Sequence, residues 1–121
     1  MTDPKNVGGL MISEDVLAAI VINSVKDIPG VSKFVQRPPD LETVFKIGDQ
    51  SLKSVKIKIK DNEVYIHIYI NIFSGYKIPV LTEQIQQKIK TSVQTMTGKI
   101  VSRVDIDILG IDFSEPEHTD K

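Results

Sequence analysis

The sequence predicts an α+β fold in which a single mixed β-sheet carries two main helices on one of its faces. Residues 55–72 alternate between apolar and polar side chains on both sides of a short turn, and residues 100–108 alternate in the same way, as half-buried strands do. Two other stretches, 14–28 and 79–97, repeat apolar residues at helical spacing. The length of 121 residues fits one domain over 1–121, with flexible polar tails at 1–7 and 114–121.

The first helix is predicted to begin after Ser13 and to end at Pro29-Gly30. The Ser13 hydroxyl can accept a hydrogen bond from a free N–H of the first turn, where acidic residues suit the helix dipole. We expect this helix to be deeply buried, because its apolar face is broad: Leu17, Ile20, Val21, Ser24 and Ile28, widened by Val16, Ile22 and Val25. Residues 8–12 and Val31–Val35 are predicted as short flanking strands.

Residues 36–51 form the least regular segment of the chain. Pro38-Pro39-Asp40 and Gly48-Asp49-Gln50 interrupt any regular element. The segment is longer than the ~12–15 residues already uncommon for a loop. The sequence leaves open whether this segment is functional, mobile or locally structured.

The central hairpin can be paired residue by residue. A two-residue turn at Asp61-Asn62 places Lys60 opposite Glu63. Counting outward, apolar residues meet on one face and polar residues on the other, and no like charges are opposed. The apolar pairs are Ile59–Val64, Ile57–Ile66 and Val55–Ile68, and the polar pairs are Lys58–Tyr65, Lys56–His67 and Ser54–Tyr69.

The second helix and the last strand complete the pattern. Pro79 suits the first turn of the helix and Gly98 its C-terminal cap. The apolar stripe of this helix is Leu81, Ile85, Ile89, Val93 and Met96. In the last strand the residues predicted to face the core are Ile100, Val104, Ile106 and Ile108, whereas Arg103, Asp105 and Asp107 face the other way. The strand–helix–strand order predicts that the strands on either side of the helix run parallel.

The composition narrows the classes of function. The chain has no cysteine, which excludes disulfides, thiolate catalysis and cysteine-bound zinc. The net charge of −1 provides no overall attraction to nucleic acid or anionic lipid. Residues 1–7 lack the basic and apolar regions of a signal peptide, and no apolar run approaches the ~20 residues of a membrane-spanning helix. We therefore expect a cytoplasmic protein without direct membrane insertion.

The candidate functional residues share the polar face of the predicted sheet: Lys56, Lys58, Tyr65, His67, Tyr69, Arg103 and Asp105. Tyrosines on an open face are typical of protein interfaces, so the first hypothesis is that this face, or the segment Gln36–Ser51, binds another protein or a second copy of the chain. The alternative is a small nucleic-acid-binding module, in which the lysines would contact phosphates and the tyrosines would stack on bases. Against it, the sequence contains no GXXG or RNP-like run.

Enzyme chemistry finds little support in the sequence. His67 is either a binding residue, a pH-sensitive group or a solvated side chain, and one histidine makes no catalytic dyad by itself. Asp105 and Asp107 could face a hard cation, but they lack a turn and further oxygen ligands. Neither a phosphate-binding glycine loop nor a nucleophile elbow is present. We expect no enzyme activity, no cofactor and no metal.

A series of short motifs runs in order from Gly9 to Phe113. Its members are Leu10-Met11-Ile12-Ser13-Glu14-Asp15-Val16, Gly30-Val31, the Gly75, Ile78 and Pro79 set, Gln84-Ile85-Gln86-Gln87-Lys88-Ile89, Met96-Thr97-Gly98, and Val104-Asp105-Ile106-Asp107-Ile108-Leu109-Gly110-Ile111. In this order the motifs resemble the alkaline shock protein family of Gram-positive bacteria, also called the general stress protein family.

The resemblance implies a small non-enzymatic α+β protein of the cytoplasm, linked to cell-envelope homeostasis and stress. Some members act through self-association and a membrane-anchored partner, so we expect an interaction or scaffold module held peripherally at the membrane through a protein partner. Two positions depart from the family pattern. Ser74-Gly75 stands where the family often has Tyr-Gly, and Asp105 where it often has Asn. A family contact made through either position would differ in this chain.

Overall fold

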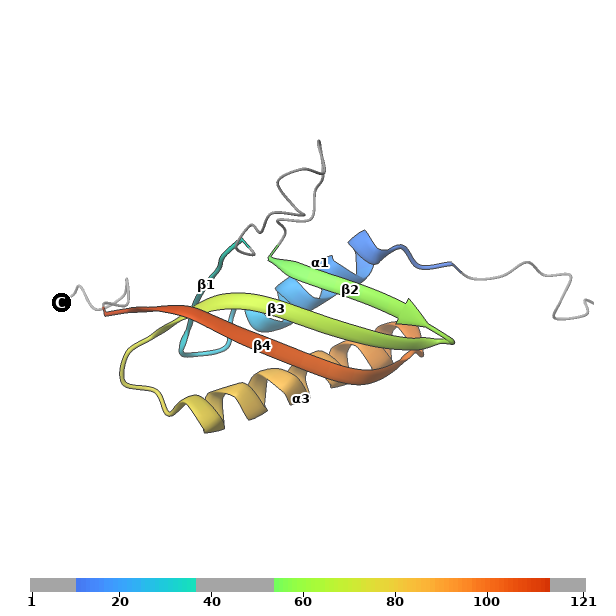
Figure 1. Cartoon of the computed structure of the whole chain (residues 1–121). Helices are drawn as coiled ribbons and strands as arrows, with labels where there is room; N and C mark the ends of the chain where they lie inside the picture. The colour runs from blue at the N-terminus through green and yellow to red at the C-terminus, as the bar shows by residue number, and fades with distance from the viewer. Residues whose placement is uncertain (1–10, 37–53, 114–121) are drawn as a thin grey trace, which may run out of the picture.

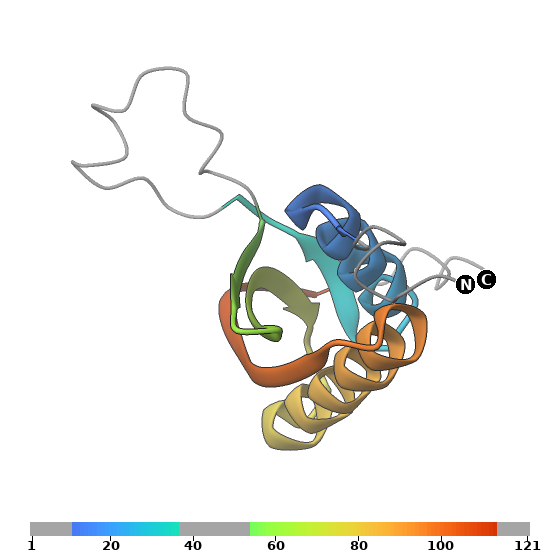
Figure 2. The same ribbon diagram turned by 90° about the vertical axis from the view of Figure 1, so that its right-hand side faces the viewer.

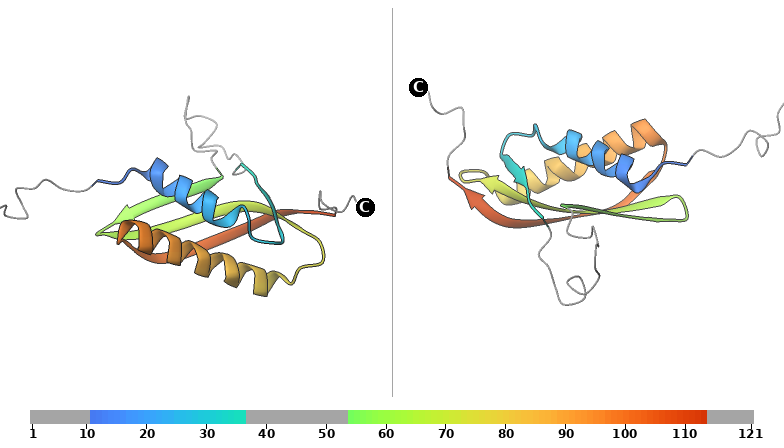
Figure 3. Two further views of the ribbon diagram at one scale, coloured as in Figure 1. Left: turned by 180° about the vertical axis from the view of Figure 1, so that it is seen from behind. Right: turned by 90° about the horizontal axis from the view of Figure 1, so that it is seen from above.

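The computed structural model describes residues 11–36 and 54–113, so the predicted tails and nearly all of the irregular segment lie outside the described residues. The elements follow the order α1 (Glu14–Val25), β1 (Val31–Phe34), β2 (Val55–Lys60), β3 (Glu63–Phe73), α3 (Ile78–Thr97) and β4 (Ile100–Asp112). Both helices lie on one face of the sheet (Figures 1 and 3). Seen end-on, α1 and α3 lie side by side against the curved sheet (Figure 2). The predicted α+β class is confirmed.

The sheet is mixed and is organised around β3. On one edge of β3, β4 runs parallel to it along the whole of residues 63–73. The antiparallel partners β2 and β1 pair with residues 63–68 and 70–72, respectively. Because β4 occupies one edge throughout, β2 and β1 must follow one another along the other edge. The predicted parallel pairing of the strands on either side of α3 is confirmed.

The hairpin of β2 and β3 has the register that the sequence predicts, from Lys60↔Glu63 to Val55↔Ile68. Asp61 and Asn62 both have positive φ, at 52° and 67°. Two consecutive residues in the left-handed region are what a type I′ turn requires, and Asp and Asn tolerate that region better than most residues. The turn therefore fixes which side chains of β2 and β3 share a face.

Tyr69 of β3 makes backbone hydrogen bonds to the residues on both sides of the segment 37–53. The N–H of Val35 donates to the carbonyl of Tyr69 at 2.9 Å, just after β1. The N–H of Tyr69 donates to the carbonyl of Ser54 at 3.0 Å, just before β2. Residues 37–53, which are not described, thus connect two points held at the same position of the sheet edge.

The helices begin and end at the predicted signals. The Ser13 hydroxyl accepts a hydrogen bond from the N–H of Val16 at 3.1 Å and caps α1. Pro79 lies in the first turn of α3, and Gly98 ends it with φ 75°. The buried stripes are Leu17, Val21 and Val25 in α1 and Leu81, Ile85, Ile89 and Val93 in α3. They pack against the apolar side chains on the helix-facing side of β2, β3 and β4.

Three residues predicted to be buried are exposed instead. Val16 is 49% exposed because α1 buries only the stripe of Leu17, Val21 and Val25. Met96 is 68% exposed although it lies at helical spacing from Ile89 and Val93; it belongs to the last turn of α3, beyond the buried series that ends at Val93. Ile100 is 56% exposed.

The exposure of Ile100 follows from a bulge in β4. Val64 pairs with Val101 but Tyr65 pairs with Arg103, so one extra residue is inserted between them. The insertion shifts the alternation, and Val101 takes the core position in place of Ile100. The strand predicted over residues 8–12 does not form at Met11 or Ile12, and its other residues lie outside the described part of the chain.

Candidate interaction face

The strand register brings all seven candidate residues to the sheet face opposite the helices. Their apolar neighbours Ile66, Ile68 and Val104 are buried in the core on the helix-facing side, and side chains alternate along a strand. The residues form three rows across β2, β3 and β4: Lys58–Tyr65–Arg103, Lys56–His67–Asp105, and Tyr69–Asp107. We call this set, with Asp107, the polar face.

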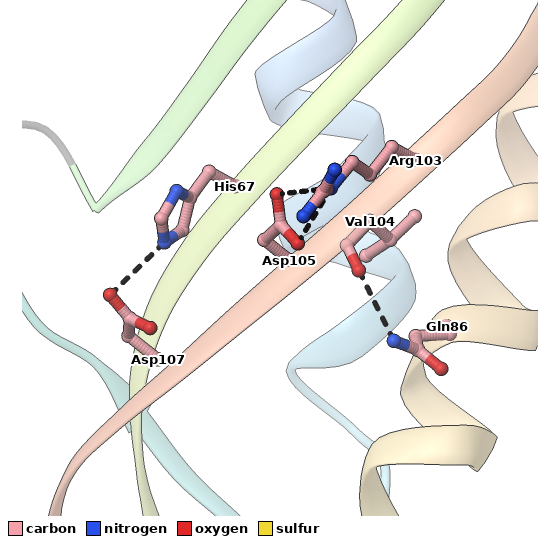
Figure 4. Close-up of polar contacts among 6 residues, drawn as sticks. All are labelled: His67, Gln86, Arg103, Val104, Asp105 and Asp107. Carbon is pink, nitrogen blue, oxygen red and sulfur yellow. Dashed lines mark hydrogen bonds and ion pairs between the residues drawn. The ribbon is translucent and has the colours of Figure 1, made fainter.

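His67 lies at the centre of the polar face and is held on two sides. Its ring stacks on Tyr69, with ring centroids 4.6 Å apart and planes within 9° of parallel. Its Nε2 lies 3.1 Å from Oδ2 of Asp107 (Figure 4). The His67 side chain is 32% exposed, whereas Tyr69 is 7% exposed, so Tyr69 is the more buried of the two stacked residues.

Arg103 and Asp105 form a second polar contact on the same face, within β4. The Nε of Arg103 donates to both carboxylate oxygens of Asp105 at 3.0 Å (Figure 4). The side chains are 69% and 43% exposed, so water screens the attraction. An exposed pair of this kind is worth about 0–1 kcal/mol, so it orients the two groups more than it stabilises the fold.

Lys56 and Lys58 occupy the β2 side of the face and are both exposed. Within the described part of the chain, neither makes an ion pair. Together with Tyr65, Ile66, His67 and Asp105 they line a shallow hollow of about 150 Å³. The face therefore has cationic side chains along β2, aromatic rings along β3, and a mainly acidic strip along β4.

Tyr65 is engaged locally by a residue that the sequence reasoning did not single out. Its hydroxyl donates to Oε1 of Glu63 at 3.2 Å, and the hydroxyl of Ser102 donates to the same oxygen at 2.8 Å. Glu63 precedes Tyr65 by two residues and so lies on the same face, a spacing that could have identified it.

The position of Tyr69 disfavours base stacking on that ring. Tyr69 is 7% exposed and its ring is stacked on His67, so it offers no free aromatic face to a nucleotide. Asp105 and Asp107 bring negative charge close to the two lysines, which weakens attraction for a phosphate backbone.

The surroundings of His67 and of the acidic side chains bear on catalysis and metal binding. His67 contacts a carboxylate and a tyrosine ring rather than a serine or threonine hydroxyl. No group of three or more His, Asp or Glu side chains in residues 11–36 and 54–113 could hold a metal ion. Within the same residues, no helix is both long enough and apolar enough to cross a bilayer.

Two glutamines of α3 partly close the outer edge of β4, beside the polar face. Gln86 Nε2 donates to the carbonyl of Val104 at 3.1 Å (Figure 4), and Gln94 Oε1 accepts from the N–H of Val101 at 3.2 Å. These side chains occupy backbone groups that an added strand would otherwise use.

A second hollow lies away from the polar face, at the N-terminal end of α3. It measures about 320 Å³ and is lined by Pro29, Gly75, Tyr76, Lys77, Val80, Leu81 and Gln84. Ile78 and Val80 nearby are 44% and 52% exposed. The sequence gives no sign of this hollow, because its walls come from two stretches far apart in the chain, Pro29 and residues 75–84.

Fold and site together define a class of small α+β protein: two helices on a mixed sheet whose other face is polar and aromatic. A model of the alkaline shock protein 23 family, described by a cell envelope-related function, matches residues 2–113. The chain belongs to this family, as the order of its sequence motifs indicated.

Two relatives from Bacillus subtilis (strain 168) are both uncharacterized proteins. YloU is 22% identical over 111 residues, covering 90% of this chain and 92% of YloU. YqhY is 30% identical over 61 residues, covering 50% of this chain and 45% of YqhY, so that match spans less than half of the relative.

A zinc form of a MamM CTD variant is similar in structure. Its TM-score is 0.50 at 6% sequence identity, over 85% of this chain and 91% of that chain. At this level of identity the likeness concerns the fold alone.

Proposed function

We propose that this protein is a non-enzymatic interaction module in cell-envelope homeostasis or stress response, and that its polar face binds another protein. The observation that carries the proposal is the arrangement of the face. Aromatic side chains lie along the central strand, and charged side chains lie along both flanking strands. Protein interfaces have the same anatomy, with aromatic residues enriched at the centre and a polar rim.

The size of the hollow favours a protein partner over a small molecule. A volume of about 150 Å³ is below the roughly 300–1,000 Å³ typical of ligand pockets. Two of the polar groups that line it, His67 and Asp105, are engaged with Asp107 and Arg103 rather than aimed into the hollow. Such a surface suits broad contact with another surface.

For localisation we propose the cytoplasm, with peripheral contact to the membrane through a membrane-anchored protein partner. The family's cell envelope-related function supports a location near the envelope. The lysines of β2 and the aspartates of β4 would set the orientation of the partner, because complementary charges fix register more than they add affinity.

Capture from envelope extracts tests the proposed function. The tagged wild-type chain is compared with a lysine-reversed variant, Lys56→Glu plus Lys58→Glu. The control variant, Lys26→Glu plus Lys88→Glu, has the same net charge but changes exposed positions just after α1 and on α3, outside the polar face.

We expect the control variant to retain the captured partner and the lysine-reversed variant to lose at least 90% of it, judged by quantitative mass spectrometry. Equal capture by all three chains, each shown to be folded by circular dichroism, would contradict a role for this face.

A further inference from the structure

The outer edge of β4 is covered over only part of its length. On one side β4 pairs with β3, and it pairs with no other described strand (Figure 1). Gln94 and Gln86 bind the N–H of Val101 and the C=O of Val104 on the other side. Of the hydrogen bonds among described residues, none reaches this outer side beyond Val104. The described structure therefore leaves the edge open from residue 105 to residue 112.

Alternation along the strand shows which backbone groups face outward on the open part. The C=O of Val104 faces outward, since it accepts a hydrogen bond from Gln86. Successive residues of a strand direct their N–H and C=O groups to opposite edges, so Ile106 and Ile108 also face outward. The residue before each of them faces β3 instead. The open edge thus presents two donors and two acceptors, which an antiparallel strand could bind.

Apolar side chains accompany these outward backbone groups. Val104 is buried, and Ile106 and Ile108 are only partly buried against the core. Leu109 and Ile111 are 44% and 46% exposed, so the apolar side chains become less covered toward the end of β4. An exposed apolar edge strand invites pairing with another chain, and proteins normally block it with lysines, proline, bulges or short strands.

The other free edges of the described sheet carry that protection. β2 has exposed lysines at alternate positions, Lys56, Lys58 and Lys60. β1 has only four residues and an irregular register between Val31 and Lys33. The open part of β4 has neither lysine nor proline, and its bulge comes after the two outward-facing residues.

We propose that the open edge of β4 binds an extended segment of a partner protein, as an added antiparallel strand in which apolar and basic residues alternate. Residues directly opposite each other in a sheet share a face. The segment's residues opposite Ile106 and Ile108 lie on the helix-facing side, where apolar side chains extend the core. Its residues opposite Asp105 and Asp107 lie on the polar face, where lysine or arginine meets a carboxylate.

The preference for basic residues rests mainly on Asp107. Its side chain is 51% exposed, and the added strand would run directly beside it. Asp105 is already bound by Arg103, which offsets part of its charge. This edge is a site separate from the lysines of β2, so the inference goes beyond the proposed function.

A second copy of the chain fits the edge less well than a basic segment. Two β4 strands paired antiparallel about a two-fold axis at Ile106 would set Asp105 of each copy opposite Asp107 of the other. Like charges directly opposite one another destabilise a strand pair. A pairing centred further along would meet the bulge at Leu109 in both copies. Charge complementarity therefore selects a basic partner.

Amide hydrogen exchange on the ¹⁵N-labelled chain tests the edge directly. In the free chain, the amides of Ile106 and Ile108 should exchange faster than those of Asp105 and Asp107, which face β3. The probe is a capped six-residue peptide that alternates lysine and valine. At saturating peptide, exchange at Ile106 and Ile108 should slow at least fivefold, whereas exchange at Asp105 and Asp107 should change little.

Two control peptides separate backbone pairing from charge, without any change to the protein. In the first, the valine nitrogens are methylated, which removes the N–H groups that bond to β4 and keeps every side chain. This peptide should not slow exchange at Ile106 or Ile108. In the second, glutamate replaces lysine and meets the carboxylates of Asp105 and Asp107, so it should bind at least tenfold more weakly.

A charge-neutral variant, Asp105→Asn plus Asp107→Asn, measures the contribution of the protein's own charges. It should bind the lysine–valine peptide at least threefold more weakly, and its binding should depend less on salt. The matched control, Glu14→Gln plus Asp27→Asn, removes the same charge from exposed positions at the start of α1 and just after it. We expect this control to bind like the wild-type chain.

Three results would overturn the inference. The first is slow exchange at Ile106 and Ile108 in the dilute free chain, since the edge would then already be closed. The second is equal binding of the lysine, glutamate and N-methylated peptides, or no slowing with any of them. The third is protection that appears only as the free chain is concentrated, because a second copy would then occupy the edge. Failure of the proposed function would be seen separately, as capture that does not depend on Lys56 and Lys58.

Discussion

Gly30 is the position where adding a single methyl group should damage the fold most clearly. It stands directly before β1 with φ 103°, and its carbonyl accepts a hydrogen bond from the N–H of Phe73 at 2.8 Å. A Cβ added there would lie 2.9 Å from Cδ2 of Tyr76 and 3.1 Å from Cδ2 of Leu81. The substitution Gly30→Ala should therefore destabilise the fold for two reasons: the positive φ is unfavourable for alanine, and the added methyl group is crowded by Tyr76 and Leu81.

A comparison with Gly75 separates the effect of backbone conformation from the effect of crowding, because Gly75 has a positive φ but no close neighbours. Its φ is 95°, and a Cβ added there would meet nothing within 4 Å. A side chain in the left-handed region costs about 1–2 kcal/mol. The loss of freedom in the unfolded chain offsets about 0.4–1 kcal/mol of that cost. Gly75→Ala should thus lower the free energy of unfolding by about 1 kcal/mol, whereas crowding adds about 1–3 kcal/mol at Gly30.

Urea denaturation followed by circular dichroism measures the difference. With a slope of about 2 kcal/mol/M, an extra 2 kcal/mol lowers the midpoint of Gly30→Ala by about 1 M relative to Gly75→Ala. In a Tyr76→Ala background, the extra loss should shrink because two of the crowded atoms are removed. Equal midpoints for Gly30→Ala and Gly75→Ala would refute the close approach of Tyr76 and Leu81 to Gly30.

Two further variants test the core and the β4 edge. Ile89 is fully buried, so Ile89→Ala should lower the free energy of unfolding by about 2–5 kcal/mol in the same assay; a loss no larger than that of the exposed Gln87→Ala would contradict the packing of α3. Gln94→Ala removes the acceptor of the Val101 N–H, so the Val101 amide should exchange faster with solvent, with about 0.5–1.5 kcal/mol of lost stability. An unchanged exchange rate would show that the glutamine does not protect the edge.

The sequence was sufficient for the hairpin because two independent signals agree there. The Asp61-Asn62 turn sets the register, and the alternation of side chains then assigns each residue to a face. The common face of Lys56 and His67 follows from that register, and Arg103 joins them through the parallel pairing of β4. No comparable signal announces the bulge at Ser102, so the alternation alone placed the start of β4 out of phase.

The sequence predicts which residues lie on the polar face better than it predicts the contacts that these residues make. Alternation says which way a side chain points, but not how deeply its neighbours cover it. Tyr69 was expected on an open face, yet it is 7% exposed. The stacking of His67 on Tyr69 and its contact with Asp107 depend on rotamers across neighbouring strands, which a single sequence does not specify.

The position of Tyr69 has a consequence for how this fold can vary. Its C=O binds the N–H of Val35 just after β1, and its N–H binds the C=O of Ser54 just before β2. The distance between the two ends of the connecting segment is therefore set by β3. Closing a longer flexible connection costs only about 0.6 kcal/mol for each doubling of its length. Because Tyr69 holds both ends, we expect a change of chain length between Gln36 and Ser54 to leave the pairing of β1 and β2 with β3 in place. The middle of this sheet edge is therefore a position at which the architecture admits insertions.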